Sequence, residues 1–197
     1  MNLSKYRIVA AASLLLVLTA CNRSAEAPAP EAPGGQAVVE APAGAGEAVA
    51  PAAAADQLQP RYAATLSEGI DFKRPGYPEF VTEVAGVSGA EDWGRWTDAS
   101  LAPAARIRFN QPLPQNFTLN LKVRDFFGVN ADKEVVVTAG DQKQTFVLAK
   151  DGDQDVQLAF AGVNGDAIEI AAPASSEPTA TDSRKMGIGL ITLSVKN

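Results

Sequence analysis

Histidine is absent from this 197-residue chain, and cysteine occurs only once, at position 21. These shortages exclude His/Cys zinc centres, Ser-His-Asp or Cys-His catalysis, and a disulfide bond within the chain. Positive charge is also scarce, with 17 Lys and Arg against 23 Asp and Glu. The resulting net charge of −6 argues against nucleic-acid or anionic-lipid binding, because both need a positive surface. We therefore expect a protein that is not an enzyme and holds no cofactor or metal.

The N-terminus explains the single cysteine. Lys5 and Arg7 precede an apolar run over residues 8–18, which is too short to span a bilayer comfortably. The run ends in Leu-Thr-Ala-Cys at residues 18–21, which resembles the bacterial lipoprotein lipobox. The resemblance implies a signal peptide over residues 1–20, cleavage before Cys21, and acylation of Cys21 by palmitate-type chains that anchor it in a lipid bilayer. The alternative is an ordinary secretory signal with an incidental cysteine.

The same resemblance predicts a location in the cell envelope, on the periplasmic side of a membrane. Asn22, rather than Asp, follows the cysteine. In the enteric sorting rule Asp at this position retains a lipoprotein at the inner membrane, so Asn22 favours the outer membrane.

After Cys21, residues 22–56 consist almost entirely of Ala, Pro, Glu and Gly, without an aromatic residue. Such a segment buries too little apolar surface to offset the entropy of ordering it. We predict that residues 21–56 form a lipidated, disordered tether. The alternative is that the tract itself binds a partner.

Residues 57–197 have the composition of a single globular domain, and their apolar residues follow a β pattern. Phe117, Leu119, Leu121 and Val123 alternate with polar residues, as in a strand with one buried face. Similar patterns predict strands around residues 105–109, 135–138, 145–148, 156–160, 168–170 and 186–195. Short strands at this spacing are typical of a sandwich or barrel. We predict an all-β fold, a single jelly-roll-like (galactose-binding-like) β-sandwich.

Three local features refine this prediction. Gly140-Asp141 is a turn signal, so residues 133–149 are expected to form a hairpin. The apolar phase flips by one residue after Leu190, which indicates a β-bulge there. Residues 77–85 could form about two helical turns, with Phe80, Val81 and Val84 on one side.

The segment from Gly86 to Ala99 (GVSGAEDWGRWTDA) contains both tryptophans of the chain. Together with Asp71-Phe72, Leu113-Pro114 and the block over residues 182–190 (DSRKMGIGL), it resembles an uncharacterised β-sandwich domain attached to bacterial phosphoglycerol-transferase-like and glycosyltransferase-like membrane proteins. The resemblance covers residues 67–197 and implies a jelly-roll-like module associated with carbohydrate. This chain has the domain on a predicted lipid tether, without a transferase part.

Strand alternation places Trp93 and Arg95 on one face and Trp96 on the other. An exposed tryptophan beside an arginine suits a sugar, which offers an apolar face and hydroxyl groups. Alternatively, Trp96 fills the core and Arg95 forms an internal ion pair with Glu91 or Asp182, which requires the two blocks to meet in space. The candidate ligand-binding residues are Trp93, Arg95, Trp96, Glu91, Asp98, Tyr77, Asp182 and Arg184.

Two further chemistries are weaker candidates. Asp151, Asp153 and Asp155 alternate as calcium ligands can, but the run lacks the glycine and glutamate of an EF-hand loop. Glu91 and Asp98 could form a glycosidase-like acid pair. A polar loop and structural carboxylates are the simpler interpretations.

These observations favour a membrane-anchored envelope lipoprotein whose β-sandwich binds envelope glycan or a glycan precursor. The alternative is a structural or assembly lipoprotein that contacts another envelope protein. A groove lined by Trp93 or Tyr77 would favour the first, and a flat exposed apolar patch would favour the second.

Overall fold

The computed structural model describes residues 58–197. The predicted signal peptide, the tether up to residue 56 and Cys21 lie outside the described residues. Within 58–197, no helix is long and apolar enough to cross a membrane. The described chain forms twelve strands: β1 (Arg61–Tyr62), β2 (Ile70–Asp71), β3 (Tyr77–Pro78), β4 (Val81–Ala85), β5 (Arg95–Asp98), β6 (Ala105–Phe109), β7 (Asn116–Asp125), β8 (Glu134–Ala139), β9 (Gln142–Val147), β10 (Asp153–Ala161), β11 (Ala167–Ala171) and β12 (Met186–Lys196).

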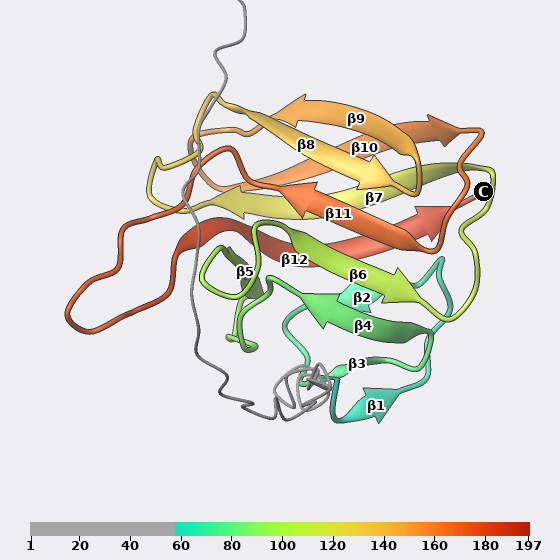
Figure 1. The fold of residues 1–197 in the computed structure, drawn as a ribbon, viewed down its shortest axis with the longest axis horizontal. Coiled ribbons are helices and arrows are strands. Elements are labelled where there is room, and N and C mark those ends of the chain that lie inside the picture. Colours follow the sequence, from blue (N-terminus) through green and yellow to red (C-terminus); the bar gives the residue numbers. More distant parts are fainter. Residues whose placement is uncertain (1–57) are drawn as a thin grey trace, which may run out of the picture. The chain divides into compact units, whose positions relative to one another are not determined.

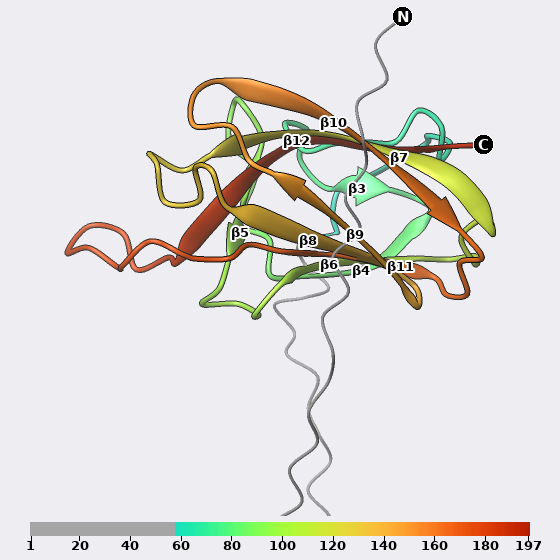
Figure 2. The same ribbon diagram turned by 90° about the horizontal axis from the view of Figure 1, so that it is seen from above.

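Ten of these strands form two five-stranded sheets that lie face to face (Figures 1 and 2). One sheet has the order β10-β7-β12-β2, with β5 also paired to β12, and the other has the order β4-β6-β11-β8-β9. The remaining two, β1 and β3, form a short parallel pair. From β6 onward the chain passes repeatedly from one sheet to the other, as it does in jelly rolls. The predicted all-β sandwich is confirmed.

The core lies between the two sheets and is built by the alternation seen in the sequence. On β7 the odd-numbered residues from Phe117 to Val123 are buried, and the residues between them are partly exposed. Val156, Leu158 and Phe160 of β10 follow the same rule. Burial of each such side chain contributes about 1.5–3 kcal/mol to folding, so this pattern specifies which face of each strand turns inward.

The hairpin and the bulge are also confirmed. β8 pairs with β9 from Glu134↔Val147 to Ala139↔Gln142, around the turn at Gly140. β12 shifts register against β7 between Leu190 and Thr192. The bulge explains how the apolar residues of both phases on β12 can be buried.

The helix considered for residues 77–85 is wrong, because this segment forms β3 and β4. Val81 pairs with Phe109 and Val84 with Ile107, and the register shifts between Val81 and Glu83. The extra residue of this bulge places Val81 and Val84 on the same buried face although they are three residues apart. The bulge in β4 thus gave the apolar residues a spacing of three, which is also the spacing seen along one face of a helix.

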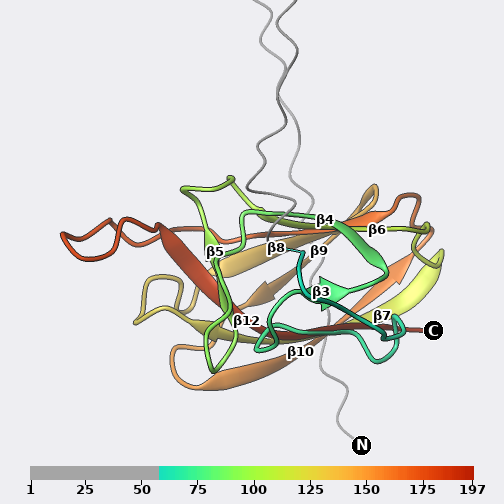
Figure 3. The ribbon, with the colours of Figure 1, turned by 90° about the horizontal axis from the view of Figure 1, so that it is seen from below.

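β5 lies beside the Met186–Leu190 half of β12, and β2 pairs with Thr192 and Leu193 farther along the same edge. Figure 3 shows β5 next to β12 at the end of the sandwich away from the C-terminus. This arrangement brings the tryptophan block and the 182–190 block together, as predicted.

Candidate functional site

The tryptophan block folds as a small hairpin that ends in a tight turn. Glu91 and Gly94 exchange backbone hydrogen bonds of 2.8 and 3.1 Å. The Ser88 hydroxyl accepts a bond from the Trp96 amide at 3.0 Å. A Cβ on Gly94 would lie 2.3 Å from the carbonyl oxygen of Leu190. Only glycine therefore lets this turn approach the backbone of β12 so closely.

Trp93 and Trp96 lie against each other, with ring centroids 4.4 Å apart. The prediction that they point to opposite faces is wrong, because Trp93 lies in the turn before β5 and strand alternation does not extend to it. Trp96 is 8% exposed and packs edge-on against Phe126, at a centroid distance of 4.8 Å. Phe126 in turn packs against Phe127. The four rings form a continuous aromatic row in which Trp96 is buried, Trp93 and Phe126 are partly exposed, and Phe127 is exposed.

Arg95 points into the interior and is 3% exposed. It donates to the backbone carbonyls of Phe72 (3.3 Å), Arg74 (3.0 Å) and Gly76 (3.1 Å). The predicted ion pair of Arg95 with Asp182 or Glu91 is therefore wrong, and so is its place beside Trp93 in a groove. Converging carbonyl oxygens of the segment 72–76 satisfy this guanidinium instead, which gives Arg95 a structural role.

Tyr77 is also interior, with no exposed surface, so the expectation that it lines a groove is wrong. The guanidinium of Arg95 lies 4.5 Å from the centroid of its ring. Burial raises the pKa of Tyr77 to about 12, partly opposed by the positive charge of Arg95. Tyr77 therefore stays neutral and packs beneath Arg95.

Asp98 is 2% exposed and holds backbone together. Its Oδ1 accepts bonds from the Ser100 amide (2.9 Å), the Ser100 hydroxyl (2.5 Å) and the Lys185 amide (3.0 Å). Asp98 lines a separate hollow of about 200 Å³, whereas Glu91 lines the groove described below. The structure does not bring the two carboxylates together as an acid pair.

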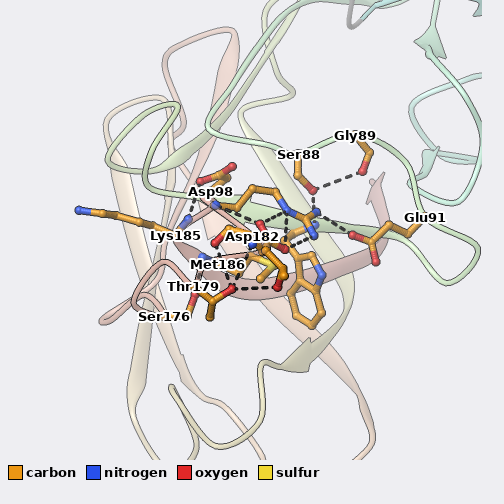
Figure 4. A network of polar contacts seen from close by, with 12 residues as sticks. Ser88, Gly89, Glu91, Asp98, Ser176, Thr179, Asp182, Lys185 and Met186 are labelled. Carbon is orange, nitrogen blue, oxygen red and sulfur yellow. Dashed lines mark hydrogen bonds and ion pairs between the residues drawn. The ribbon is translucent and has the colours of Figure 1, made fainter.

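Arg184, rather than Arg95, forms the ion pairs that were predicted with Asp182 and Glu91. Its guanidinium donates to Asp182 through Nε (3.0 Å) and Nη2 (2.7 Å), and to Glu91 through Nη1 (2.8 Å). Glu91 accepts a further bond from Trp93 Nε1 at 2.8 Å. One fork thus joins the two sequence blocks and orients Trp93. Figure 4 shows Glu91 and Asp182 within this polar network.

The bonds from Arg184, first from its side chain and then from its amide, lower the pKa of Asp182 to about 2. Asp182 and Glu91 in turn raise the pKa of Arg184. Asp182 and Arg184 are therefore both ionised at neutral pH. The side chains of the network are about one-third exposed, and ion pairs this close to solvent contribute little to stability. Their main effect is to fix position.

Two sets of hydrogen bonds, in addition to the Arg184 fork, hold the loop that carries Asp182. Ser176 exchanges hydrogen bonds with Met186, and Thr179 bonds to both the amide and the carbonyl of Asp182. These contacts are drawn in Figure 4. Together with the Arg184 fork, they give the loop a defined course beside β12.

These elements enclose an open groove of about 480 Å³ at the β5 end of the sandwich. Its walls carry both aromatic rings and charged groups. The lining residues are Glu91, Trp93, Trp96, Arg124, Asp125, Phe126, Phe127, Asp182, Arg184 and Met186. Of the eight predicted ligand-binding residues, the structure brings five to this groove (Glu91, Trp93, Trp96, Asp182 and Arg184) and leaves Arg95, Asp98 and Tyr77 outside it.

Sequence reasoning missed the wall formed by Arg124 to Phe127. Asp125 accepts bonds from the amides of Gly128 and of Asn130, the latter at 2.7 Å. The buried Asn130 donates to the carbonyls of Ala174 and Gly187 at 3.0 Å each. Hydrogen bonds therefore fix the backbone of the loop that carries Phe127, whose side chain is 92% exposed. The signal was the motif Asp-Phe-Phe-Gly directly after a predicted strand.

Arg124 holds Trp93 from the side of β7. Its guanidinium carbon lies 4.7 Å from the Trp93 ring centroid, while Nε and Nη2 donate to Asp153 Oδ1 at 3.0 and 2.6 Å. Asp153 was a candidate calcium ligand, and here it pairs with Arg124. Within residues 58–197, no three metal-ligating side chains converge.

Comparison with known proteins identifies the domain. Residues 55–197 match the family described as Domain of unknown function (DUF7024). The chain is 34% identical over 132 residues to Phosphoglycerol transferase I of Escherichia fergusonii (63% of this chain, 17% of that protein). It is also 34% identical over 135 residues to the protein of the same name from Salmonella choleraesuis (64% and 17%).

The chain thus spans about a sixth of the length of these curated relatives. A solved structure titled "BiXyn10A CBM1 APO" aligns with a TM-score of 0.41 and 15% identity, over 68% of this chain and 99% of that one. The matches confirm the resemblance to the β-sandwich domain of phosphoglycerol-transferase-like proteins, and the chain belongs to the DUF7024 family.

Proposed function

We propose that this domain is a non-catalytic glycan-binding module, which binds envelope glycan or a glycan precursor in the groove at the β5 end of the sandwich. The observation that carries the proposal is the row of aromatic rings along a groove whose charged groups are already oriented. The relatives' name, Phosphoglycerol transferase I, supports a role beside machinery that modifies an envelope molecule.

The aromatic row supplies the apolar part of such a site. Trp93 is fixed on three sides, by the Trp96 ring, the Arg124 guanidinium and the bond to Glu91. Rigid aromatic rings with a polar edge bind ligands that are apolar on one face and polar at the rim. The pyranose rings of sugars have this character.

Phe127 supplies a second contact at the rim. Its φ is +47°, a conformation that bulky residues rarely adopt. Strained backbone of this kind concentrates at functional sites, and here it holds an almost fully exposed ring over the groove. A solvent-exposed aromatic ring held this way gains burial when a ligand covers it.

The polar groups of the groove complement hydroxyls. An ionised carboxylate offers about four acceptor positions, and Glu91 uses one for Arg184 and one for Trp93. Arg184 retains N–H groups beyond those bonded to Asp182 and Glu91. Free acceptors and free donors therefore lie side by side, as binding of hydroxyl groups requires.

In this proposal the protein is a lipoprotein, and its anchor keeps the domain close to the glycan. Cys21 anchors it on the periplasmic side of the envelope, with the outer membrane favoured, and residues 21–56 tether the domain of residues 57–197. The proposal assigns no reaction to the domain, because the carboxylates of the groove are engaged in orienting Arg184, Trp93 and the 125–130 loop.

Titration with neutral hexasaccharides tests the proposal directly. The chain has two tryptophans, and both line the groove, so tryptophan fluorescence reports on this site alone. A panel of maltohexaose, laminarihexaose and chitohexaose should include at least one sugar that shifts the emission and gives heat in calorimetry. Phe127→Ala should weaken that binding about tenfold, because one stacked ring contributes roughly 1–1.5 kcal/mol.

The matched control is Leu101→Ala, which also truncates an exposed apolar side chain (53% exposed) but lies outside the groove lining. It should leave sugar binding unchanged. If no sugar binds, or both variants bind like the parent, the glycan proposal fails.

Contact with another envelope protein is the second candidate, and the exposure of Phe127 favours it, since exposed aromatic residues are enriched at protein interfaces. Crosslinking in cells from position 127 separates the two functions. A crosslink to one defined protein, combined with no sugar binding, would support the second.

A further inference from the structure

The charged groups that line the groove also bear on the charge of the ligand that the groove can bind. Three carboxylates, Glu91, Asp125 and Asp182, line the groove together with the two guanidinium groups of Arg124 and Arg184. The surrounding domain adds no excess of positive charge, because residues 57–197 contain 14 Lys and Arg against 18 Asp and Glu, a net of −4.

Neither guanidinium is left uncompensated. Arg184 is bound by two carboxylates, Asp182 at 2.7 Å and Glu91 at 2.8 Å. Arg124 is bound by Asp153 at 2.6 Å, and its face covers the ring of Trp93. An anionic ligand would have to compete with a carboxylate for each of these cations.

Proteins that capture phosphate or carboxylate groups commonly leave an arginine fork free for bidentate contact. In this groove both forks already face carboxylates, and the charge that remains unpaired is negative. Asp125 bonds to backbone amides alone, so its negative charge stays within the lining. Like charge at a binding site lowers affinity for the wrong ligand and so provides specificity.

We infer that the groove selects uncharged stretches of glycan and rejects glycan that carries anionic substituents such as phosphodiester, sulfate or carboxylate groups. This inference rests on the proposed glycan-binding function and specifies the chemical class of its ligand. A module with this preference distinguishes an unsubstituted glycan from the same glycan after an acidic group has been transferred to it.

A matched pair of ligands tests the selectivity on the full chain. The probes are the neutral hexasaccharide that binds best in the panel above and the same hexasaccharide phosphorylated at its primary hydroxyls. At low salt the phosphorylated form should bind at least about tenfold more weakly, and the difference should shrink at high salt, because repulsion between charges is screened.

Asp153→Asn tests the cause. Asp153 is the carboxylate partner of Arg124 but does not line the groove. Its neutralisation should expose a free cation beside Trp93, so that the phosphorylated sugar recovers about threefold or more in affinity while neutral-sugar binding changes little. Asp155→Asn is the control, since Asp155 is an exposed aspartate on the same strand, makes no ion pair within the described residues, and gives the same change in net charge.

The outcomes separate the two claims. If the phosphorylated sugar binds as tightly as the neutral one, the selectivity is overturned and the glycan-binding function stands. If Asp155→Asn rescues binding as well as Asp153→Asn does, the paired-arginine explanation is overturned. If neither form of any sugar binds, the proposed function and the inference both fail.

Discussion

The guanidinium of Arg95 lies among three backbone carbonyls beneath the surface. Arginine suits this place because its planar group carries five donors in a fixed geometry, whereas lysine carries a point charge with different directions. Arg95→Lys should therefore destabilise the domain by about 2–4 kcal/mol, since it leaves buried carbonyls unpaired and a charge poorly solvated. Chemical denaturation of the parent and the variant measures this change.

Arg61→Lys is the control for this experiment. Arg61 also donates to a backbone carbonyl, that of Glu79 at 2.8 Å, but the bond is exposed to solvent. Its replacement should change stability by less than about 0.5 kcal/mol. Equal denaturation midpoints for Arg95→Lys and the parent would contradict the structural role of Arg95.

The lowered pKa of Asp182 predicts that the stability of its loop depends on pH. Its pKa is lowered to about 2 by Arg184, so the ionised form stabilises the folded loop above about pH 4, near the ordinary pKa of aspartate. This contribution is lost as the pH falls towards 2. NMR titration of the side-chain carboxyl should give a pKa near 2 in the parent and a higher pKa in Arg184→Gln, which loses the guanidinium but keeps the bond from the residue 184 amide to Asp182. An unshifted pKa in the parent would show that the fork does not persist in solution.

Strand β12 forms the floor under Trp93. A Cβ at Gly189 would lie 2.6 Å from the Trp93 ring and 2.6 Å from Cγ of Arg124. Gly189→Ala should push the ring out of its seat, shift the tryptophan emission to the red and cost about 1–3 kcal/mol through overpacking. Gly89→Ala is the control, because nothing lies within 4 Å of a Cβ at that position. Unchanged emission in Gly189→Ala would place Trp93 elsewhere in solution.

Regular strands could be predicted from the sequence because apolar and polar residues alternate along them, and this alternation can be read directly from the sequence. The buried face of β7, the β8–β9 hairpin and the bulge of β12 all follow from local alternation or turn residues. β3 and β4 could not be predicted this way, because the bulge between Val81 and Glu83 changes the spacing that alternation relies on.

The candidate groove was predictable only in part. The two sequence blocks do meet, but which arginine joins them depends on the turn before β5, which ends the strand phase at Gly94. Arg184 rather than Arg95 therefore reaches Glu91. Phe126 and Phe127 were missed because the alternation read from the sequence ends at Val123 and does not indicate where an aromatic residue beyond it lies.

For the molecule as a whole, the lipid anchor is a prediction that concerns residues outside the described domain. Cys21→Ala should move the protein from the membrane fraction to the soluble fraction, because the acyl chains supply most of the membrane affinity. Fractionation followed by immunoblotting measures this, with Cys21→Ser as a second variant that cannot carry the thioether-linked lipid. Sedimentation of both variants with membranes at parental levels would contradict the anchor.

Strand β12 is the last of the twelve in chain order, yet it occupies the interior of its sheet, with β7 on one side of it and β5 and β2 on the other. Polypeptides are synthesised from the N-terminus, and domains fold as their parts become available. β7 and β5 are therefore made well before the strand that joins them, and the groove cannot assemble until residues 186–196 have been delivered. A chain interrupted during synthesis or export before this point would lack the centre of a sheet rather than an edge, so quality control would meet an unfolded product rather than a weakened binder.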